Sequence, residues 1–185
     1  AMVLVGALGG YVLSTATQSA AAPTPAAGAG PAAAAAAPDA HVVDEVALKT
    51  YRDILTRDPK NAQAAVSAGN MLYDAKRFEE SIGFYQQAMA ANGGDANIST
   101  DLGTALWYTG RTDAALAQYA VSLAIEPTHA QTLYNMGIVK SEGKRDYHGA
   151  VTAWQTLLAN HPQYANAATV RTMIADAQRK AGVAN

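Results

Sequence analysis

The sequence predicts an all-α solenoid of three stacked helix pairs, with one further helix before the pairs and one after them. The first observation is a repeated glycine: Gly69, Gly103 and Gly137 are 34 residues apart at each step. The second is an aromatic residue that recurs with nearly the same spacing, at Tyr85, Tyr119 and Trp154. A fixed period of this length is typical of paired helices that stack side by side.

Charge and cysteine content narrow the function. The chain has 185 residues, a formal net charge of −2 and no cysteine, and none of its first 38 residues is charged. A nucleic-acid partner is not expected, because phosphate binding needs a dense basic patch. The absence of cysteine excludes thiolate metal sites and covalent haem attachment. We therefore expect no cofactor and no bound metal.

Residues 1–16 are interpreted as an N-terminal transmembrane anchor that is incomplete at its start. Residues 2–13 are apolar throughout, but a bilayer span needs about 20 such residues. A signal-peptide core and an apolar helix buried in a soluble partner are the alternatives. Gly6, Gly10 and Ser14 recur every four residues, a small-residue stripe that lets another membrane helix approach closely. The plainer explanation is that glycine is simply common in membrane spans.

Residues 17–40 are rich in alanine and proline and are predicted to be a semi-stiff linker to the domain at 41–185. No basic residue follows the apolar segment until Lys49. Because cytoplasmic flanks of a span carry Lys and Arg, the domain is expected on the periplasmic side of a bacterial inner membrane.

The domain is expected to open with a helix from His41, capped by Asp39 and ended before Pro59, because the residue before proline avoids helical angles. Three helix pairs and a closing helix follow, predicted at about 62–75 with 78–91, 96–108 with 112–125, 130–142 with 147–160, and 164–181. The third pair has one extra residue near Arg145 and Asp146, which is expected to lengthen its inner turn.

The array resembles tetratricopeptide repeats. The second repeat shows the family's spacing most fully, with Leu102-Gly103, then Ala115, Tyr119 and Pro127. The resemblance has departures, since the family's tryptophan position holds Ala65, Ser99 and Leu133. It implies a right-handed superhelix whose hollow is lined by the first helix of each pair, with the opening helix acting as a lone second helix and the final helix as a cap.

The resemblance also implies that the hollow binds a protein or peptide. The candidate partner-binding residues are those on the non-core face of the first helices: Asn70, Tyr73, Asp74, Thr104, Trp107, Tyr108, Gln131, Tyr134 and Ile138, with Gln63, Val66, Thr100 and Ser141 beside them. Tyr73, Trp107, Tyr108 and Tyr134 would give an aromatic lining suited to protein contacts. The alternative is that some of these side chains fill the core between repeats.

Two other functions are not favoured. The hollow positions of the first two repeats lack Lys and Arg, so a clamp for a C-terminal carboxylate is not expected. The four histidines lie at turns or helix starts without His-x3-His spacing, and no catalytic motif is present, so an enzyme is not expected.

The sequence is therefore most consistent with a membrane-anchored interaction scaffold that serves as an accessory or assembly subunit of a bacterial membrane complex. The alternative is a periplasmic assembly factor that holds an apoprotein tail, resembling the repeat domains of c-type cytochrome maturation. In either case the partner is a protein, and the membrane is reached through the N-terminal helix.

Overall fold

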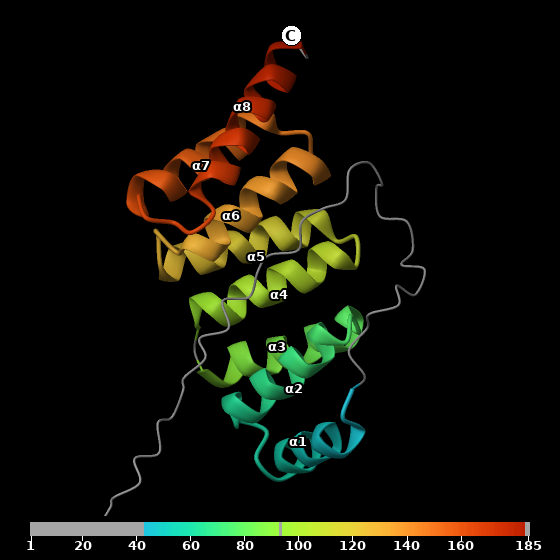
Figure 1. Cartoon of the computed structure of the whole chain (residues 1–185). Helices are drawn as coiled ribbons and strands as arrows, with labels where there is room; N and C mark the ends of the chain where they lie inside the picture. Colours follow the sequence, from blue (N-terminus) through green and yellow to red (C-terminus); the bar gives the residue numbers. More distant parts are fainter. Residues whose placement is uncertain (1–42, 93, 184–185) are drawn as a thin grey trace, which may run out of the picture.

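The computed structural model describes residues 43–92 and 94–183. Over these residues the chain forms eight α-helices and no strand, as predicted (Figure 1). The predicted anchor at 1–16, with Gly6, Gly10 and Ser14, and the linker at 17–40 lie outside the described residues. None of the helices that the structure describes combines the length and the apolar character needed to cross a bilayer.

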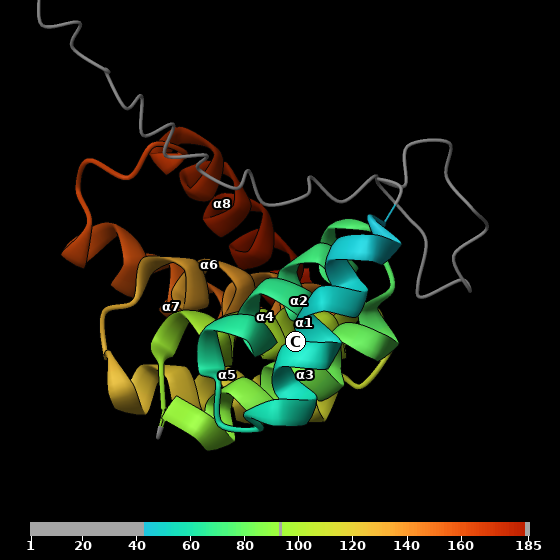
Figure 2. The same ribbon diagram turned by 90° about the horizontal axis from the view of Figure 1, so that it is seen from below.

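The helices stack in chain order from one end of the molecule to the other (Figure 1). Their bounds are α1 Glu45–Arg57, α2 Ala62–Asp74, α3 Phe78–Asn92, α4 Ala96–Tyr108, α5 Thr112–Ile125, α6 Ala130–Ile138, the π-helical turn η1 Val139–Gly143, α7 Tyr147–Asn160 and α8 Ala167–Val183. In Figure 2, which looks along the stack, each pair is displaced from the one before and α8 lies to one side. The described residues therefore form a solenoid and not a bundle around one centre.

Each helix pair is closed by an aromatic ring that lies directly on glycine. The side chains of Tyr85, Tyr119 and Trp154 are at most 2% exposed. A Cβ atom built on Gly103 would lie 2.6 Å from the ring of Tyr119. Glycine therefore permits the close approach of the two helices in a pair, which explains why the glycine and aromatic positions repeat together.

The inner turns of the three pairs share one geometry. Lys76, Gly110 and Arg145 all have positive φ, at 60°, 80° and 54°. In the first two turns, the residue after the one with positive φ donates its N–H to the carbonyl five residues back. These bonds are Arg77 N to Leu72 O at 2.8 Å and Arg111 N to Leu106 O at 2.9 Å. This is the Schellman arrangement that ends many helices.

The extra residue of the third repeat does not lengthen its inner turn, so that prediction is wrong. The left-handed residue is Arg145, and the closing bond from Asp146 N reaches Lys140 O, six residues back, at 2.8 Å. The insertion is taken up by η1, where the helix widens by one residue before an unchanged turn. Single inserted residues are commonly absorbed as π-bulges of this kind.

Two predicted helix starts are also corrected. The opening helix begins at Glu45 and not at His41, because the carboxylate of Asp44 accepts the backbone N–H groups of Val46 and Ala47, both at 3.0 Å. The last helix begins at Ala167 and not at Tyr164, because two successive turns precede it. In the first, Tyr164 N donates to His161 O, and in the second, Ala167 N donates to Tyr164 O. Asp39, the predicted cap, lies outside the described residues.

An ion-pair ladder links successive repeats. Arg77 donates to Glu45 of α1 at 2.6 Å, Arg111 pairs with Glu79, and Lys144 pairs with Asp113 at 2.7 Å. The three acidic residues are 34 residues apart. Glu45 thus occupies the position that begins a second helix, which agrees with the prediction that α1 is a lone second helix.

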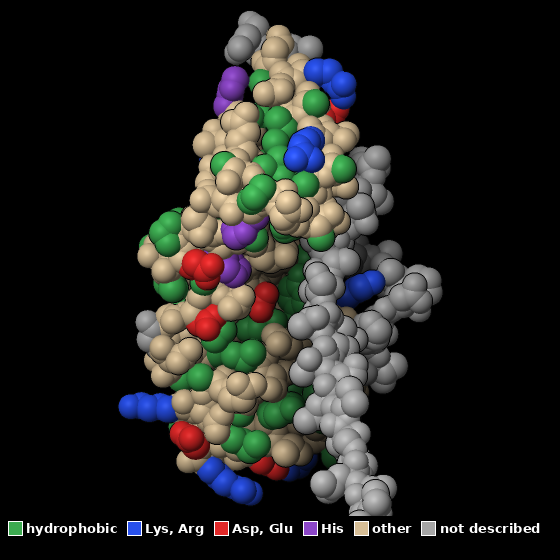
Figure 3. Space-filling model, turned by 60° about the vertical axis from the view of Figure 1, so that its left-hand side comes forward, with side chains coloured by type: hydrophobic (Ala, Val, Ile, Leu, Met, Phe, Trp, Pro, Cys, Tyr) green, Lys and Arg blue, Asp and Glu red, His purple; other side chains and the backbone are tan. Residues whose placement is uncertain are grey.

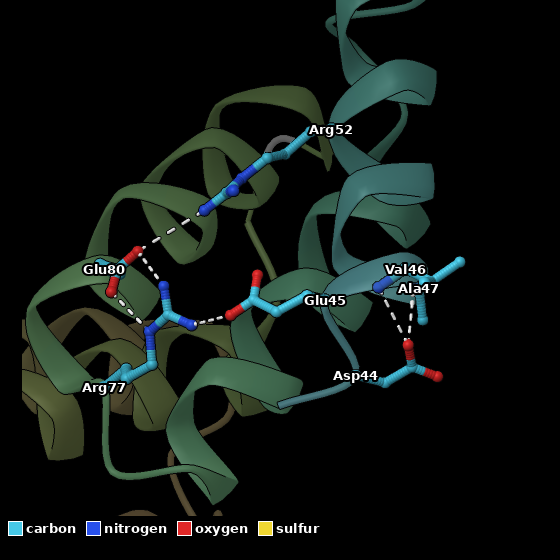
Figure 4. Close-up of polar contacts among 7 residues, drawn as sticks. All are labelled: Asp44, Glu45, Val46, Ala47, Arg52, Arg77 and Glu80. Atoms are coloured by element: carbon cyan, nitrogen blue, oxygen red, sulfur yellow. Dashed lines mark hydrogen bonds and ion pairs between the residues drawn. The ribbon is translucent and has the colours of Figure 1, made fainter. Parts of the chain in front are cut away.

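At α1 the ladder widens into a small network (Figure 4). Arg77 also makes two bonds to Glu80, at 2.6 and 2.7 Å, and Arg52 lies 3.5 Å from the same carboxylate. Because these side chains are partly exposed, each pair adds little to stability, and their main effect is to fix the register of α1 on α3.

The buried core is divided between the second and third repeats. One cluster of buried apolar residues runs from α1 to α5, and another runs from α6 to α8. Between them lies a buried hydroxyl network in which the Oγ atoms of Thr100, Ser122 and Thr132 are 2.5–3.0 Å apart. His129 Nδ1 lies 2.7 Å from Thr132 Oγ1 and continues the network toward the surface.

Candidate functional site

The candidate site is a groove between α2 and α4, the first helices of the first two pairs. It has a volume of about 460 Å³. Its lining residues come from α2, from α4, from the last residue of α3 and from the turn before α4: Ala62, Gln63, Val66, Asn70, Asn92, Asp95, Asn97, Ile98 and Asp101. We call this the α2–α4 groove.

The amide of Asn70 is oriented by the helix behind it. The hydroxyl of Tyr85, from α3, donates to Asn70 Oδ1 at 2.9 Å. Because Tyr85 is buried and cannot rotate freely, it fixes which end of the amide faces outward. The side chain of Asn70 is exposed, so its NH₂ group is presented as a donor on the groove side.

Asp101 is the most perturbed ionisable group in the groove. Burial raises the pKa of its carboxyl to about 7, and the nearby charges of Asp95 and Asp74 act in the same direction. Among the residues that the structure describes, its carboxylate has no hydrogen-bond or ion-pair partner. Asp95, in contrast, caps α4 by accepting the N–H groups of Asn97 and Ile98, at 2.8 and 3.1 Å.

The equivalent space between α4 and α6 is closed by the protein's own hydrogen bonds. Asn135, which occupies the position of Asp101 in the next repeat, donates from Nδ2 to Thr104 Oγ1 at 3.1 Å. Thr104 occupies the position of Asn70 and also contacts the Tyr119 hydroxyl, at 3.1 Å. Gln131 donates to Asn135 Oδ1 at 3.0 Å. The bond from α6 to α4 that closes the second interval therefore has no counterpart between Asp101 and Asn70 in the first.

The predicted residues do not form one continuous lining. Asn70, with Gln63 and Val66, lies in the α2–α4 groove, and Asp74 is exposed one helical turn beyond Asn70. Thr104 and Gln131 are half-buried and belong to the closed interval. Ile138 packs against the core cluster of α6–α8.

The predicted aromatic lining is also divided. Tyr73 and Tyr108 join Phe78 in a cluster where α2 and α4 end, with the rings of Phe78 and Tyr108 stacked at 4.5 Å. Tyr108 is 40% exposed, whereas Trp107 is half-buried against the core. This cluster is separated along the helices from the α2–α4 groove, which is lined by residues nearer the helix starts.

Three residues expected to face the hollow are buried. Tyr134 is 5% exposed and lies beside Tyr164 of the segment before α8, with ring centroids 6.1 Å apart. Thr100 and Ser141 are buried as well. Tyr134 and Thr100 are covered by neighbouring elements, and Ser141 lies in the π-helical turn, whose altered register changes the face that it presents.

Six residues of the groove were not predicted from the sequence: Ala62, Asn92, Asp95, Asn97, Ile98 and Asp101. A signal for Asp101 is present in the repeat itself, because the equivalent positions hold Ser67 and Asn135. Polar residues at one register position of every first helix indicate a side that faces the preceding repeat. The described residues contain no group of three or more His, Cys, Asp or Glu side chains placed to hold a metal ion.

A family model described as tetratricopeptide repeat matches residues 45–96. A probable UDP-N-acetylglucosamine–peptide N-acetylglucosaminyltransferase SPINDLY from Hordeum vulgare is 30% identical over 123 residues. That alignment covers 63% of this chain but only 13% of the curated relative. The similarity therefore concerns a small part of that protein.

Several solved structures share the fold. A MamA protein superposes with a TM-score of 0.61 at 17% identity, covering 72% of this chain and 76% of that one. A tetratricopeptide-repeat protein from Parabacteroides merdae gives 0.62 at 16% identity, covering 71% and 52%. The tetratricopeptide-repeat domain of Arabidopsis OM64 gives 0.58 at 19%, covering 64% and 94%. The tetratricopeptide-repeat model thus covers the first helices of the array, residues 45–96, and the solenoid fold of the described helices is shared with these structures.

Proposed function

We propose that this chain is a protein–protein interaction scaffold that holds an extended segment of a partner polypeptide in the α2–α4 groove. A solenoid of stacked repeats offers an extended surface of the kind used for protein binding. The observation that carries the proposal is the contrast between two equivalent intervals. The Asn135–Thr104 bond closes one, whereas Asp101 and Asn70 leave the other open.

The composition of the groove suits a polypeptide. A bound extended chain exposes backbone carbonyl and N–H groups, which need hydrogen-bond partners when water is displaced. Gln63, Asn70 and Asn97 supply amide donors and acceptors for them. Val66 and Ile98 supply apolar surface for side chains of the partner.

We extend the proposal to the setting of the chain. Residues 1–16 are proposed to anchor the protein in a bacterial inner membrane, and residues 17–40 to act as a spacer to a periplasmic repeat domain. The support is the apolar run at 2–13 and the absence of a basic residue before Lys49. In this setting the protein serves as an accessory or assembly subunit of a membrane complex.

The alternative setting is an assembly factor that holds the tail of an apoprotein, as in c-type cytochrome maturation. The same open groove supports it, because an unfolded tail is an extended peptide. Purification from membranes in mild detergent distinguishes the two. A partner retained at fixed stoichiometry supports the subunit, whereas transient binding of an unfolded tail supports the assembly factor.

The groove is tested with peptides selected against the full chain from a displayed random library. The strongest binder is labelled and its affinity measured by fluorescence polarisation. Gln63→Trp places a large side chain at the groove and is expected to abolish binding. Gln86→Trp is the matched control, because Gln86 is also an exposed helical glutamine but lies on α3, outside the groove. Equal affinity of the two variants would show that the groove is not the site.

The proposed location is tested separately. A phosphatase reporter that is active only in the periplasm is fused after residue 185 of the full chain and expressed in a bacterial host. Activity is expected with the full chain and is expected to be lost when residues 1–16 are removed. Activity confined to a cytoplasmic reporter would contradict the membrane proposal while leaving the groove untouched.

A further inference from the structure

The α2–α4 groove is acidic and lacks a counter-charge. Its lining includes Asp95 and Asp101 but no Lys or Arg, and Asp74 lies one turn beyond Asn70 on α2. Lys60 and Lys76 flank α2 in the sequence, but the charges that act on Asp101 are the carboxylates of Asp95 and Asp74. In the view of Figure 3, acidic side chains lie near the middle of the molecule and again at its lower end, and most Lys and Arg side chains lie toward its ends.

The environment of Asp101 disfavours its ionised form. Burial and the two neighbouring carboxylates together raise its pKa to about 7, well above the usual value of an aspartate. Charge alone does not make a site, but here the acidic groups line an open groove beside the NH₂ group of Asn70, whose Oδ1 is held by Tyr85. A cation placed in the groove would meet an unpaired carboxylate and a second one held by its capping bonds.

A metal ion is a poor candidate for that cation. Asp95 commits its carboxylate to the backbone at the start of α4. No group of three metal-binding side chains is present among the described residues, the groove included. A single ammonium or guanidinium group needs fewer ligands than a metal ion and can pair with one carboxylate while its stem covers apolar surface such as Val66 and Ile98.

We propose that the partner segment carries a Lys or Arg side chain that enters the α2–α4 groove and pairs with Asp101. This inference rests on the proposed function, because it names the chemistry of the segment that the groove would hold. The amide of Asn70 would bind the backbone of the segment, while Asp101 and the nearby Asp95 and Asp74 would select its charge. Segments with Glu or Asp at that position would be excluded by three like charges.

The inference carries a pH dependence with a defined sign. A cationic side chain binds the ionised carboxylate, so below pH 7 it must displace a proton from Asp101 and its affinity falls. The ionisable groups that interact with Asp101 come from several elements: Asp74 and Tyr73 of α2, Tyr85 of α3, Asp95 at the start of α4 and Tyr119 of α5.

The test selects a random twelve-residue library against the full chain and compares three baits: the unaltered protein, Asp101→Asn and Asp113→Asn. Asp113 is an exposed carboxylate on α5, so its substitution makes the same change of charge away from the groove. Lys and Arg are expected to be enriched at one position with the unaltered and Asp113→Asn baits and not with Asp101→Asn. The best peptide is then compared with its counterpart carrying norleucine in place of the basic residue.

The norleucine peptide is expected to bind at least about tenfold more weakly, which is the usual worth of a hydrogen bond to a charged group. The same loss is expected for Asp101→Asn, and the two changes together should cost little more than either alone. The affinity of the unaltered protein should rise from pH 6 to pH 8, a readout that needs no variant and stands even if Asp101→Asn folds poorly.

The outcomes separate this inference from the proposed function. Gln63→Trp could abolish the binding of peptides that are neutral or acidic, or of peptides that bind the Asp101→Asn variant as tightly as the unaltered protein. Either result would overturn the charge assignment and leave the groove as a binding site. If the selected peptides bind Gln63→Trp as tightly as the unaltered protein, both the proposed groove and the charge assignment are overturned. Additive losses from Asp101→Asn and norleucine would also overturn the pairing, since they would show that the two groups do not interact.

Discussion

Substitution of Gly103 by alanine tests the packing on which the helix pairs depend. In a helix interior this change normally stabilises a protein by about 0.5–1 kcal/mol, because glycine loses more backbone freedom on folding. At Gly103 the added Cβ atom would lie 2.6 and 2.7 Å from two carbons of the Tyr119 ring. That ring is fully buried and its hydroxyl is held by Thr104, so it has little room to move.

The net effect follows from the two opposing contributions. Overpacking a buried site costs about 1–3 kcal/mol, and an immobile ring places Gly103 in the upper part of that range. We therefore expect Gly103→Ala to lower the free energy of unfolding by about 1–2 kcal/mol. For a chain of this size each kcal/mol corresponds to a change of about 2–4 °C in the melting temperature.

Gly83→Ala is the matched control. Gly83 is an exposed residue of α3, and a Cβ atom built there meets nothing within 4 Å. The two substitutions alter the unfolded chain equally, so the difference between them isolates the contact with the ring. Urea denaturation of the full chain, followed by circular dichroism, should show Gly83→Ala stabilised by about 0.5–1 kcal/mol. Stabilisation of similar size by Gly103→Ala would refute the close-approach explanation.

Three further predictions concern other parts of the array. Lys76 has a φ of 60°, a conformation that costs a residue with a side chain about 1 kcal/mol. Lys76→Gly should therefore raise the melting temperature, whereas Lys76→Ala should not. Equal melting temperatures for the two variants would contradict backbone strain at this position. Thr132→Val removes the hydroxyl between His129 and Thr100 and should cost about 1–3 kcal/mol in urea denaturation. Thr152→Val on the exposed face of α7 should cost far less, and similar losses would mean that the buried network adds nothing. The raised pKa of Asp101 means that the folded protein binds a proton more tightly than the unfolded chain. Its contribution to stability is therefore complete below about pH 4 and is lost as the pH rises to about 7. Relative to the unaltered protein, Asp101→Asn should be less sensitive to pH between 4 and 7 and more stable at pH 8. An identical pH profile for the two would show that Asp101 is not desolvated.

The repeat architecture was predictable because its signals are local. Helices α4, α5 and α7 begin and end where the sequence analysis placed them. Their limits are set by turn residues such as Gly110 and by prolines such as Pro127, which act within a few residues of their own position. The fold class also followed from the period, since glycine and aromatic positions repeat together only when one packs on the other.

The predictions that were wrong concern elements whose limits depend on distant residues or on which of two local conformations the chain adopts. The sequence reveals one extra residue in the third repeat, but an inserted residue can widen a helix as easily as a turn. The actual place, η1, follows from the unchanged turn at Arg145. Asp44 and Asp39 are both plausible caps in the sequence, and only the structure distinguishes them.

The candidate site was predicted less well, because a groove is made by two repeats and not by one. Helical periodicity predicts which face of α2 carries Asn70, but it does not predict which residues of α4 lie opposite that face. Asp101 belongs to the next repeat, and its role depends on the absence of a bond like that of Asn135 to Thr104. Tyr134 was expected to be exposed because the repeat pattern does not reveal what covers it. The ring of Tyr164 lies beside it, and Tyr164 belongs to the segment before the last helix, outside the repeat pattern.

Hydrogen–deuterium exchange of the full chain, with and without a saturating selected peptide, tests the proposed binding site most directly. Binding in the α2–α4 groove should slow exchange in residues 62–70 and 92–101 and leave the exposed face of α7 at 147–160 unchanged. Slowed exchange confined to α5 or α7, with residues 62–70 and 92–101 unaffected, would place the partner elsewhere and contradict the proposed site.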